Sequence, residues 1–155
     1  MERHVNLHLK AYLELNSLFY FRQSGFREHH SCQTALIINE NNIAGSLFSD
    51  FSKAFDLVDH SLLILKLKLY NIDTSWFSSY LNKRFQQNHY AGTISDTKEG
   101  ISGVPQGSIL GQILFLIYVN DLPLSLSSTY ADIFADDTTI GTSSHSIDTL
   151  VETLT

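Results

Sequence analysis

The sequence predicts an α+β fold, because helical and short strand-like segments alternate along the chain and a hairpin-like pair stands near its end. The 155 residues are 43% hydrophobic and 17% charged, with 8 Gly and 2 Pro. That composition is typical of one globular domain and excludes a low-complexity or disordered chain. The single cysteine, Cys32, excludes a disulfide framework and a cysteine-based zinc site.

Helices are expected where apolar residues recur at intervals of three and four. They cover residues 3–18, a segment that follows the N-cap Ser31, and residues 62–69, 76–81 and 108–119. Asp73 or Thr74 is expected to cap the helix at 76–81. The segment 108–119 is apolar on all sides, so it is expected to be buried nearly all round. Residues 148–155 have the pattern of a helix that has only begun, so the chain is interpreted as cut rather than finished.

Strands are expected in short β-rich segments flanked by turn residues. They cover Gly45 to Phe51 and residues 85–94, 99–104, 129–134 and 138–141. An Asn-rich turn at residues 39–42 precedes the first strand. The last two strands are separated only by the residues 135–137, so the sequence predicts a hairpin with two acids at its tip.

Three carboxylates stand where a fold would usually avoid them. Asp50 ends an apolar strand, and Asp136 and Asp137 occupy the hairpin tip. Each has a structural alternative, because Asp favours turns and strand ends by bonding the local backbone. Together they would form an oxygen cluster whose mutual repulsion requires neutralising cations, and hard oxygen ligands select Mg²⁺ or Mn²⁺. Two such ions about 3.5–4 Å apart promote in-line phosphoryl transfer, as in polymerases and nucleases.

Other site patterns are absent from the sequence. No acidic segment has the spacing of an EF-hand loop, and the histidines show no ligand spacing. No Walker-type phosphate loop, dinucleotide-binding glycine motif or nucleophile elbow is present. The acids therefore carry the strongest chemical signal in the chain.

Three segments stand out, at 49–60, 103–111 and 134–137, and together they resemble the reverse transcriptases of non-LTR (LINE-like) retrotransposons. Ser49 to His60 resembles their first palm motif, and Gly103 to Gly111 resembles the second. Phe134 to Asp137 is similar to their [YF]-x-D-D tetrad. Gln23 to Arg27 and Tyr80 to Arg84 resemble stretches that precede the two palm motifs. The motifs occur in family order over nearly the whole chain, which implies a polymerase palm built as an antiparallel sheet packed on helices.

The resemblance implies a role for each matching residue. Asp50, Asp136 and Asp137 would be catalytic and would hold two Mg²⁺ ions, with Mn²⁺ as a possible substitute. The resemblance assigns the dNTP to the residues Phe51, Ser52, Lys53, Ala54, Phe55, Gln106 and Gly107. The backbone amides of residues 51–54 would face the triphosphate as an anion nest, and the ring at position 55 would exclude a 2′-hydroxyl.

Some of these residues have plainer alternatives. Phe55 could be a core aromatic, and Gln106 could form a hydrogen bond at the start of a helix. Arg27 and Lys53 are candidate nucleic-acid contacts, and each could equally be a solvated surface residue. The chain also departs from the family pattern, with Gln112 in place of a usual Pro and Cys32 in place of a usual Thr.

The implied function is RNA-directed DNA polymerase activity on an RNA template, a DNA primer and dNTP. Residues 1–43 would be finger-side helices and residues 44–155 the palm core, with the thumb and the N-terminal fingers absent. The isolated chain is therefore expected to have little or no activity. An inactive or domesticated remnant that acts only as an interaction or nucleic-acid-binding module is the alternative. A nuclease fits less well, because it has no need of the Pro-Gln-Gly turn.

The net charge of −6 argues at first against an anionic partner. Residues 101–155 carry six acids and no Lys or Arg, whereas residues 61–100 carry five bases and three acids. Bound metal ions would cancel the charge of the acids that act as ligands. No apolar run approaches the roughly 20 residues of a membrane span. A soluble intracellular protein of the cytoplasm or the nucleus, with no membrane partner, is expected.

Overall fold

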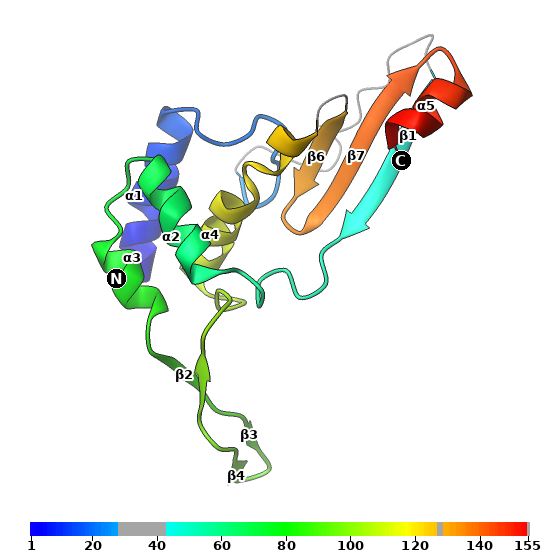
Figure 1. The fold of residues 1–155 in the computed structure, drawn as a ribbon. Helices are drawn as coiled ribbons and strands as arrows, with labels where there is room; N and C mark the ends of the chain where they lie inside the picture. Colours follow the sequence, from blue (N-terminus) through cyan, green and yellow to red (C-terminus); the bar gives the residue numbers. More distant parts are fainter. Residues whose placement is uncertain (28–42, 127–128, 155) are drawn as a thin grey trace.

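The computed structural model describes residues 1–27, 43–126 and 129–154 (Figure 1). The described helices are α1 (Glu2–Leu15), α2 (His60–Leu69), α3 (Ser75–Leu81), α4 (Ile109–Val119), the short 3-10 helix η2 (Leu122–Ser125) and α5 (Ile147–Leu154). The strands are β1 (Ile43–Asp50), β2 (Arg84–Gln86), β3 (His89–Tyr90), β4 (Thr93–Ile94), β5 (Lys98–Gly100), β6 (Tyr130–Phe134) and β7 (Asp137–Ser144). The paired strands are antiparallel and most of the helices pack on one another in a separate layer, which confirms the α+β class.

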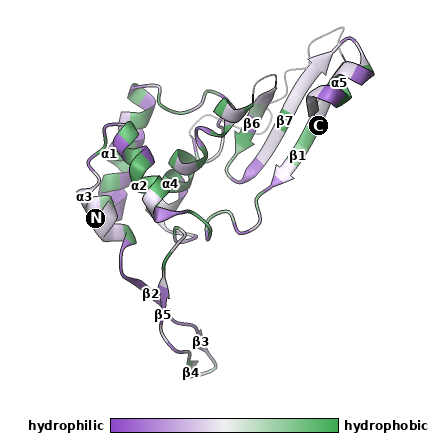
Figure 2. Ribbon diagram, in the orientation of Figure 1, coloured by the Kyte–Doolittle hydropathy of each residue, from purple (hydrophilic) through white to green (hydrophobic). Residues whose placement is uncertain are grey.

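The hydrophobic core lies where α1 and α2 pack on α4, with α3 packed on α2. Figure 2 shows hydrophobic residues gathered on these helices and hydrophilic ones along the β2–β5 hairpin. Leu110 and Leu114 of α4 are completely buried against Leu13 of α1 and Leu63 of α2. The sequence segment that is apolar on all sides is therefore the central helix of this layer, as predicted. None of the helices among the described residues is long and apolar enough to cross a membrane.

The start of α4 is fixed by local chemistry. The Ser108 hydroxyl accepts a hydrogen bond from the Gly111 amide at 2.9 Å, which satisfies one of the free N–H groups of the first turn. A Cβ atom at position 111 would lie 2.5 Å from the Pro105 carbonyl oxygen, so only glycine allows this turn to close on the helix. The helix therefore begins where the sequence analysis places it.

The three-stranded sheet has the order β1-β7-β6, with both pairs antiparallel. β6 and β7 form the expected hairpin, in which Phe134 pairs with Asp137. β1 pairs with β7 along its whole length and brings Asp50 opposite Asp137. α5 packs on β1 and β7, and Figure 1 shows β6 on the side of the sheet nearest α4.

Two of the expected strands differ from the structure. Residues 85–94 are interrupted: β2 pairs with β5, and β3 turns back on β4 at Ala91 and Gly92, which both have positive φ. Figure 1 shows this long hairpin projecting from the helical layer. The strand expected at 99–104 ends at Gly100, because the following residues turn to contact the segment after β1.

The remaining boundaries are close to those expected. β7 extends to Ser144, three residues beyond the predicted strand, because β1 supplies pairing partners along its whole length. Thr74 occupies the N-cap position of α3, but the side chain that bonds the helix belongs to Asp73, which accepts from the Ser75 amide at 2.8 Å. The helix expected after Ser31 and the Asn-rich turn at 39–42 lie outside the described residues.

Candidate active site

Asp50 and Asp137 face each other across β1 and β7. They are register partners at the end of the pair, so their side chains leave the same face of the sheet. Both are exposed, and neither carboxylate has a hydrogen bond or ion pair with any residue in the described parts of the chain. Like charges directly opposite one another destabilise a sheet. The pair therefore contributes no stability of its own, and the ligand role predicted for it stays a prediction.

Asp136 lies in the turn between β6 and β7, beside this pair. The residue before it, Ala135, has a φ of +58° and is buried, so the turn is tight and covered on one side. Asp136 itself is half-buried. Within residues 1–27, 43–126 and 129–154, no three His, Cys, Asp or Glu side chains converge as a ready ligand set. The structure thus brings together a pair of carboxylates with a third in the adjacent turn, and metal binding by them stays a prediction.

The segment after Asp50 is a chain of turns with its backbone partly exposed. Lys53 has a φ of +54°, and its carbonyl accepts from the amides of Asp56 and Leu57 at 3.0 and 3.1 Å. The Ala54 amide donates to the Phe51 carbonyl at 3.3 Å, so it is already engaged. The Ser52 and Lys53 amides have no backbone partner among the described residues. The Phe51 amide likewise has no backbone partner there, so three of the four amides of the nest expected at 51–54 are still open to an anion.

Phe55 is half-buried, and its aromatic ring packs at the edge of the hydrophobic core. Its ring stacks on Phe115 of α4, with centroids 4.4 Å apart, and meets the ring of Phe26 edge-on at 6.5 Å. This packing matches the plainer of the two roles that the sequence analysis allows. Exclusion of a 2′-hydroxyl by the same ring stays a prediction.

The segments that resemble the two palm motifs are joined by a seam of backbone contacts. The Gly103 amide donates to the Val58 carbonyl and the Val104 amide to the Phe55 carbonyl, both at 2.8 Å. Gly103 has a φ of +84°, and a Cβ atom there would lie 2.7 Å from the Asp56 carbonyl oxygen. The Gly-Val-Pro-Gln-Gly stretch therefore needs its first glycine for close approach to the residues that follow β1.

Sequence analysis missed two members of this seam. His60 contacts the Gly103 carbonyl oxygen through Nε2 at 2.8 Å, and the Asp56 carboxylate accepts from Gln106 Nε2 at 3.4 Å. Both lie inside the segment 49–60 that resembles the first palm motif. Gln106 is thus held by a long-range side-chain contact, not by the helix-start bond considered as its alternative.

An open cleft of about 810 Å³ lies along this seam. Its lining includes two cations, Lys53 and Arg84, together with Asp56, His60 and Gln106. The structure therefore places two of the predicted nucleotide-binding residues on one cleft. Gly107, next to it, has a φ of +78° and nothing within 4 Å of where a Cβ atom would be. The sequence signal that could have indicated Arg84 is its place in the segment Tyr80 to Arg84 before the second motif.

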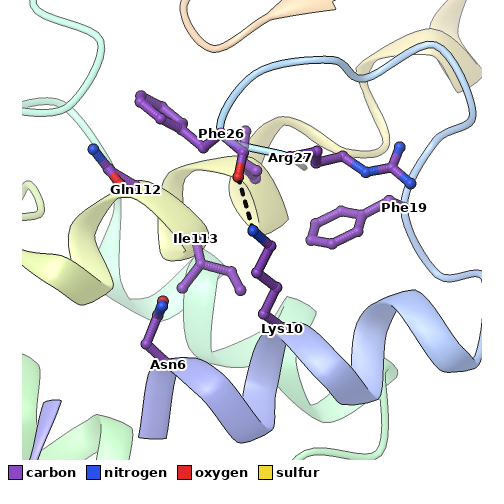
Figure 3. A pocket seen from close by; sticks show the side chains of 8 residues that line it. Asn6, Lys10, Phe19, Phe26, Arg27, Gln112 and Ile113 are labelled. Carbon is purple, nitrogen blue, oxygen red and sulfur yellow. Dashed lines mark hydrogen bonds between the residues drawn. The ribbon is translucent and has the colours of Figure 1, made fainter. Parts of the chain in front are cut away.

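Arg27 points into the protein. Its guanidinium donates to both Glu14 carboxylate oxygens, at 2.9 and 2.8 Å, and to the Gln23 carbonyl at 2.9 Å. Figure 3 shows it beside Phe19, at a small cavity of about 80 Å³. There Lys10 donates to the Phe26 carbonyl at 3.3 Å. Contact of Arg27 with nucleic acid stays a prediction, and the structure gives this side chain partners within the protein.

Comparison with known proteins identifies the family of the chain. The family described as reverse transcriptase (RNA-dependent DNA polymerase) matches residues 1–155. The "Probable RNA-directed DNA polymerase from transposon X-element" of Drosophila melanogaster is 31% identical over 152 residues, covering 88% of this chain and 17% of that protein. The "RNA-directed DNA polymerase from mobile element jockey" of the same species is 33% identical over 147 residues, covering 81% of this chain and 16% of that protein.

The chain spans less than a fifth of the length of these relatives. The family match nonetheless runs from its first residue to its last and includes Asp50, Asp136, Asp137 and the seam that joins the two palm-like motifs. The chain therefore belongs to the reverse transcriptase (RNA-dependent DNA polymerase) family.

Proposed function

We propose that this chain is the catalytic portion of an RNA-directed DNA polymerase of a non-LTR retrotransposon. The observation that carries the proposal is the placement of Asp50 directly opposite Asp137, beside the turn that holds Asp136. The relatives are named RNA-directed DNA polymerases from mobile elements, and this chain would share their template, an RNA, and their product, a DNA. Residues 1–43 would belong to the fingers and residues 44–155 to a palm.

Asp50, Asp136 and Asp137 are the residues that would hold Mg²⁺ or Mn²⁺. Their carboxylate oxygens are hard ligands, and none of them has a protein partner in the described structure. The ions, when bound, would activate the primer 3′-hydroxyl and stabilise the departing pyrophosphate. The protein's own part would be to hold Asp50 and Asp137 on one face of the sheet, in a fixed pairing register, with Asp136 in the adjacent turn.

The cleft beside the seam would bind the dNTP. The free amides of Ser52 and Lys53 and the Lys53 ammonium group would meet the triphosphate. Gln106 and Gly107 would lie along the base and the template, and the Phe55 ring would exclude a 2′-hydroxyl. This assignment is supported by the position of Lys53 and Gln106 on one cleft.

Divalent-ion binding is the first test. The 155-residue chain would be titrated with Mn²⁺ under electron paramagnetic resonance, alongside Asp50→Asn, Asp137→Asn and the control Asp96→Asn in the remote hairpin. Binding that weakens in the two site variants and persists in the control supports the proposal. Equal binding by all four proteins contradicts it.

Catalysis is tested in the complete reading frame that contains this chain. Primer extension on an RNA template with Mg²⁺ is expected, and Asp136→Asn is expected to abolish it while leaving template binding intact. If the complete protein binds nucleic acid but extends no primer, the alternative of an inactive binding module holds.

A further inference from the structure

A segment distant in sequence supports the outer edge of β6. Residues 22–24 run parallel to this strand, with a bridge between Gln23 and Ile133. The Ser24 amide donates to the Ile133 carbonyl at 2.8 Å, and the Ile133 amide donates to the Arg22 carbonyl at 3.2 Å. The Arg22 side chain also pairs with Asp132 on the same strand, at 3.2 Å. The edge that leads into the acidic turn is therefore covered.

The next residue, Gly25, lies directly on the turn. A Cβ atom at position 25 would be 2.2 Å from the Ala135 nitrogen and 2.9 Å from its Cα atom. These are backbone atoms at the centre of the turn, so they cannot move aside as a flexible side chain could. Ala135 has a φ of +58°, a conformation that L-residues rarely adopt, and it immediately precedes Asp136. Contact with Gly25 leaves Ala135 almost completely buried.

Gly25 is itself held in place by Gln23. The Gln23 side chain is completely buried, and its Oε1 accepts from the Gly25 amide at 2.8 Å. The Gln23 carbonyl receives the Arg27 guanidinium, which is paired with Glu14 of α1. The support is thus anchored in the helical layer. It links the core to the turn between β6 and β7.

We propose that Gly25, held by Gln23, is a positioning residue for the acidic turn. It keeps Ala135 in its left-handed conformation and so fixes the backbone of Asp136, which lies in the turn next to the Asp50–Asp137 pair. This inference deepens the proposed function and rests on it, since the direction of Asp136 matters for the binding of divalent ions. Gly25 touches no substrate and acts only through the turn.

The test compares two glycine substitutions in the 155-residue chain. Gly25→Ala places a methyl group against the turn, whereas Gly100→Ala adds the same methyl group where the nearest atom, the Arg84 carbonyl oxygen, is 3.8 Å away. Gln23→Met is a second variant that removes only the acceptor for Gly25, because Gln23 Nε2 has no partner among the described residues. Amide chemical shifts from NMR, Mn²⁺ affinity and circular dichroism are recorded for each.

For Gly25→Ala we expect the amide shifts of residues 135–137 to change while those of α2 do not. The Mn²⁺ dissociation constant is expected to rise at least about tenfold, the effect of losing a residue that orients a metal ligand. Gln23→Met is expected to change the same amides, and Gly100→Ala to leave both readouts unchanged. Unaltered shifts at 135–137 and wild-type affinity in a folded Gly25→Ala protein would overturn the inference.

Two further measurements separate the possible failures. If Gly25→Ala does not fold, hydrogen exchange is measured in the unaltered chain. Slow exchange of the Ser24 and Ile133 amides supports the contact between residues 22–25 and β6, and exchange at the rate of a free amide overturns it. If the unaltered chain binds no Mn²⁺, the proposed function fails. In that case the amide shifts of residues 135–137, compared between Gly25→Ala and the unaltered chain, still show whether Gly25 determines the conformation of the turn.

Discussion

Removing one charge of the opposed acidic pair should stabilise the protein when no metal is present. Asp50 and Asp137 are register partners, so their Cβ atoms are about 4.5–5.5 Å apart. Two unit charges about 5 Å apart in water repel by about 0.8 kcal/mol. Salt at physiological strength, with a screening length of about 8 Å, reduces this repulsion to about 0.4 kcal/mol. Asp137→Asn is therefore expected to raise the free energy of unfolding by about 0.4–0.8 kcal/mol.

The assay is thermal unfolding with and without Mg²⁺. A gain of this size raises the Tm of a domain of this length by about 1–3 °C in a metal-free buffer. Mg²⁺ at ten times its dissociation constant should stabilise the unaltered chain by about 1.4 kcal/mol, whereas a variant that binds the ion about tenfold more weakly gains only about 0.4 kcal/mol. The order of stability therefore reverses when the ion is added.

Two further variants make the result specific. Asp96→Asn removes the same charge from the remote hairpin and should show neither the gain nor the reduced Mg²⁺ effect. The double variant Asp50→Asn/Asp137→Asn should be no more stable than either single one, because each single change already removes the repulsion. A lower Tm for Asp137→Asn in metal-free buffer, or an additive gain in the double variant, would refute the reasoning.

Other predictions concern the helical part of the molecule. Leu114→Ala removes a completely buried side chain and should cost about 2–5 kcal/mol in urea denaturation, whereas Leu124→Ala, at 86% exposed, should cost almost nothing. Ser108→Ala removes the cap of α4 and should cost about 0.5–2 kcal/mol by the same measurement. The pKa of Asp73 is lowered because its carboxylate accepts hydrogen bonds from Ser75. That stabilisation is present above the unfolded pKa of 3.8 and is lost as pH falls through the lower folded value. Unfolding followed by circular dichroism across this acid range should show the loss of stability in the unaltered chain and not in Asp73→Asn.

Local patterns were sufficient to locate most elements. The 109–119 helix can be recognised from a mostly apolar segment, interrupted only at Gly111 and Gln112, that follows the capping residue Ser108. The β6–β7 hairpin can be recognised from two β-rich segments on either side of two acidic residues. Such signals depend only on neighbours within a few residues, so they can be seen in sequence. The strand predicted at 99–104 was wrong beyond Gly100, because the backbone there is bent by its contact with Asp56, more than forty residues away.

The sequence alone was enough to predict which residues carry the chemistry: three acids at a strand end and a hairpin turn, and a glycine-rich turn before a buried helix. How these residues lie relative to one another is set by the tertiary structure. The pairing register of β1 and β7 sets Asp50 opposite Asp137, and nothing local to either strand specifies that register. The roles of Gln23 and Gly25 likewise depend on a turn about 110 residues away. Such contacts join residues that are far apart along the chain. A sequence pattern reports only on residues that are close together along the chain, so it cannot predict them.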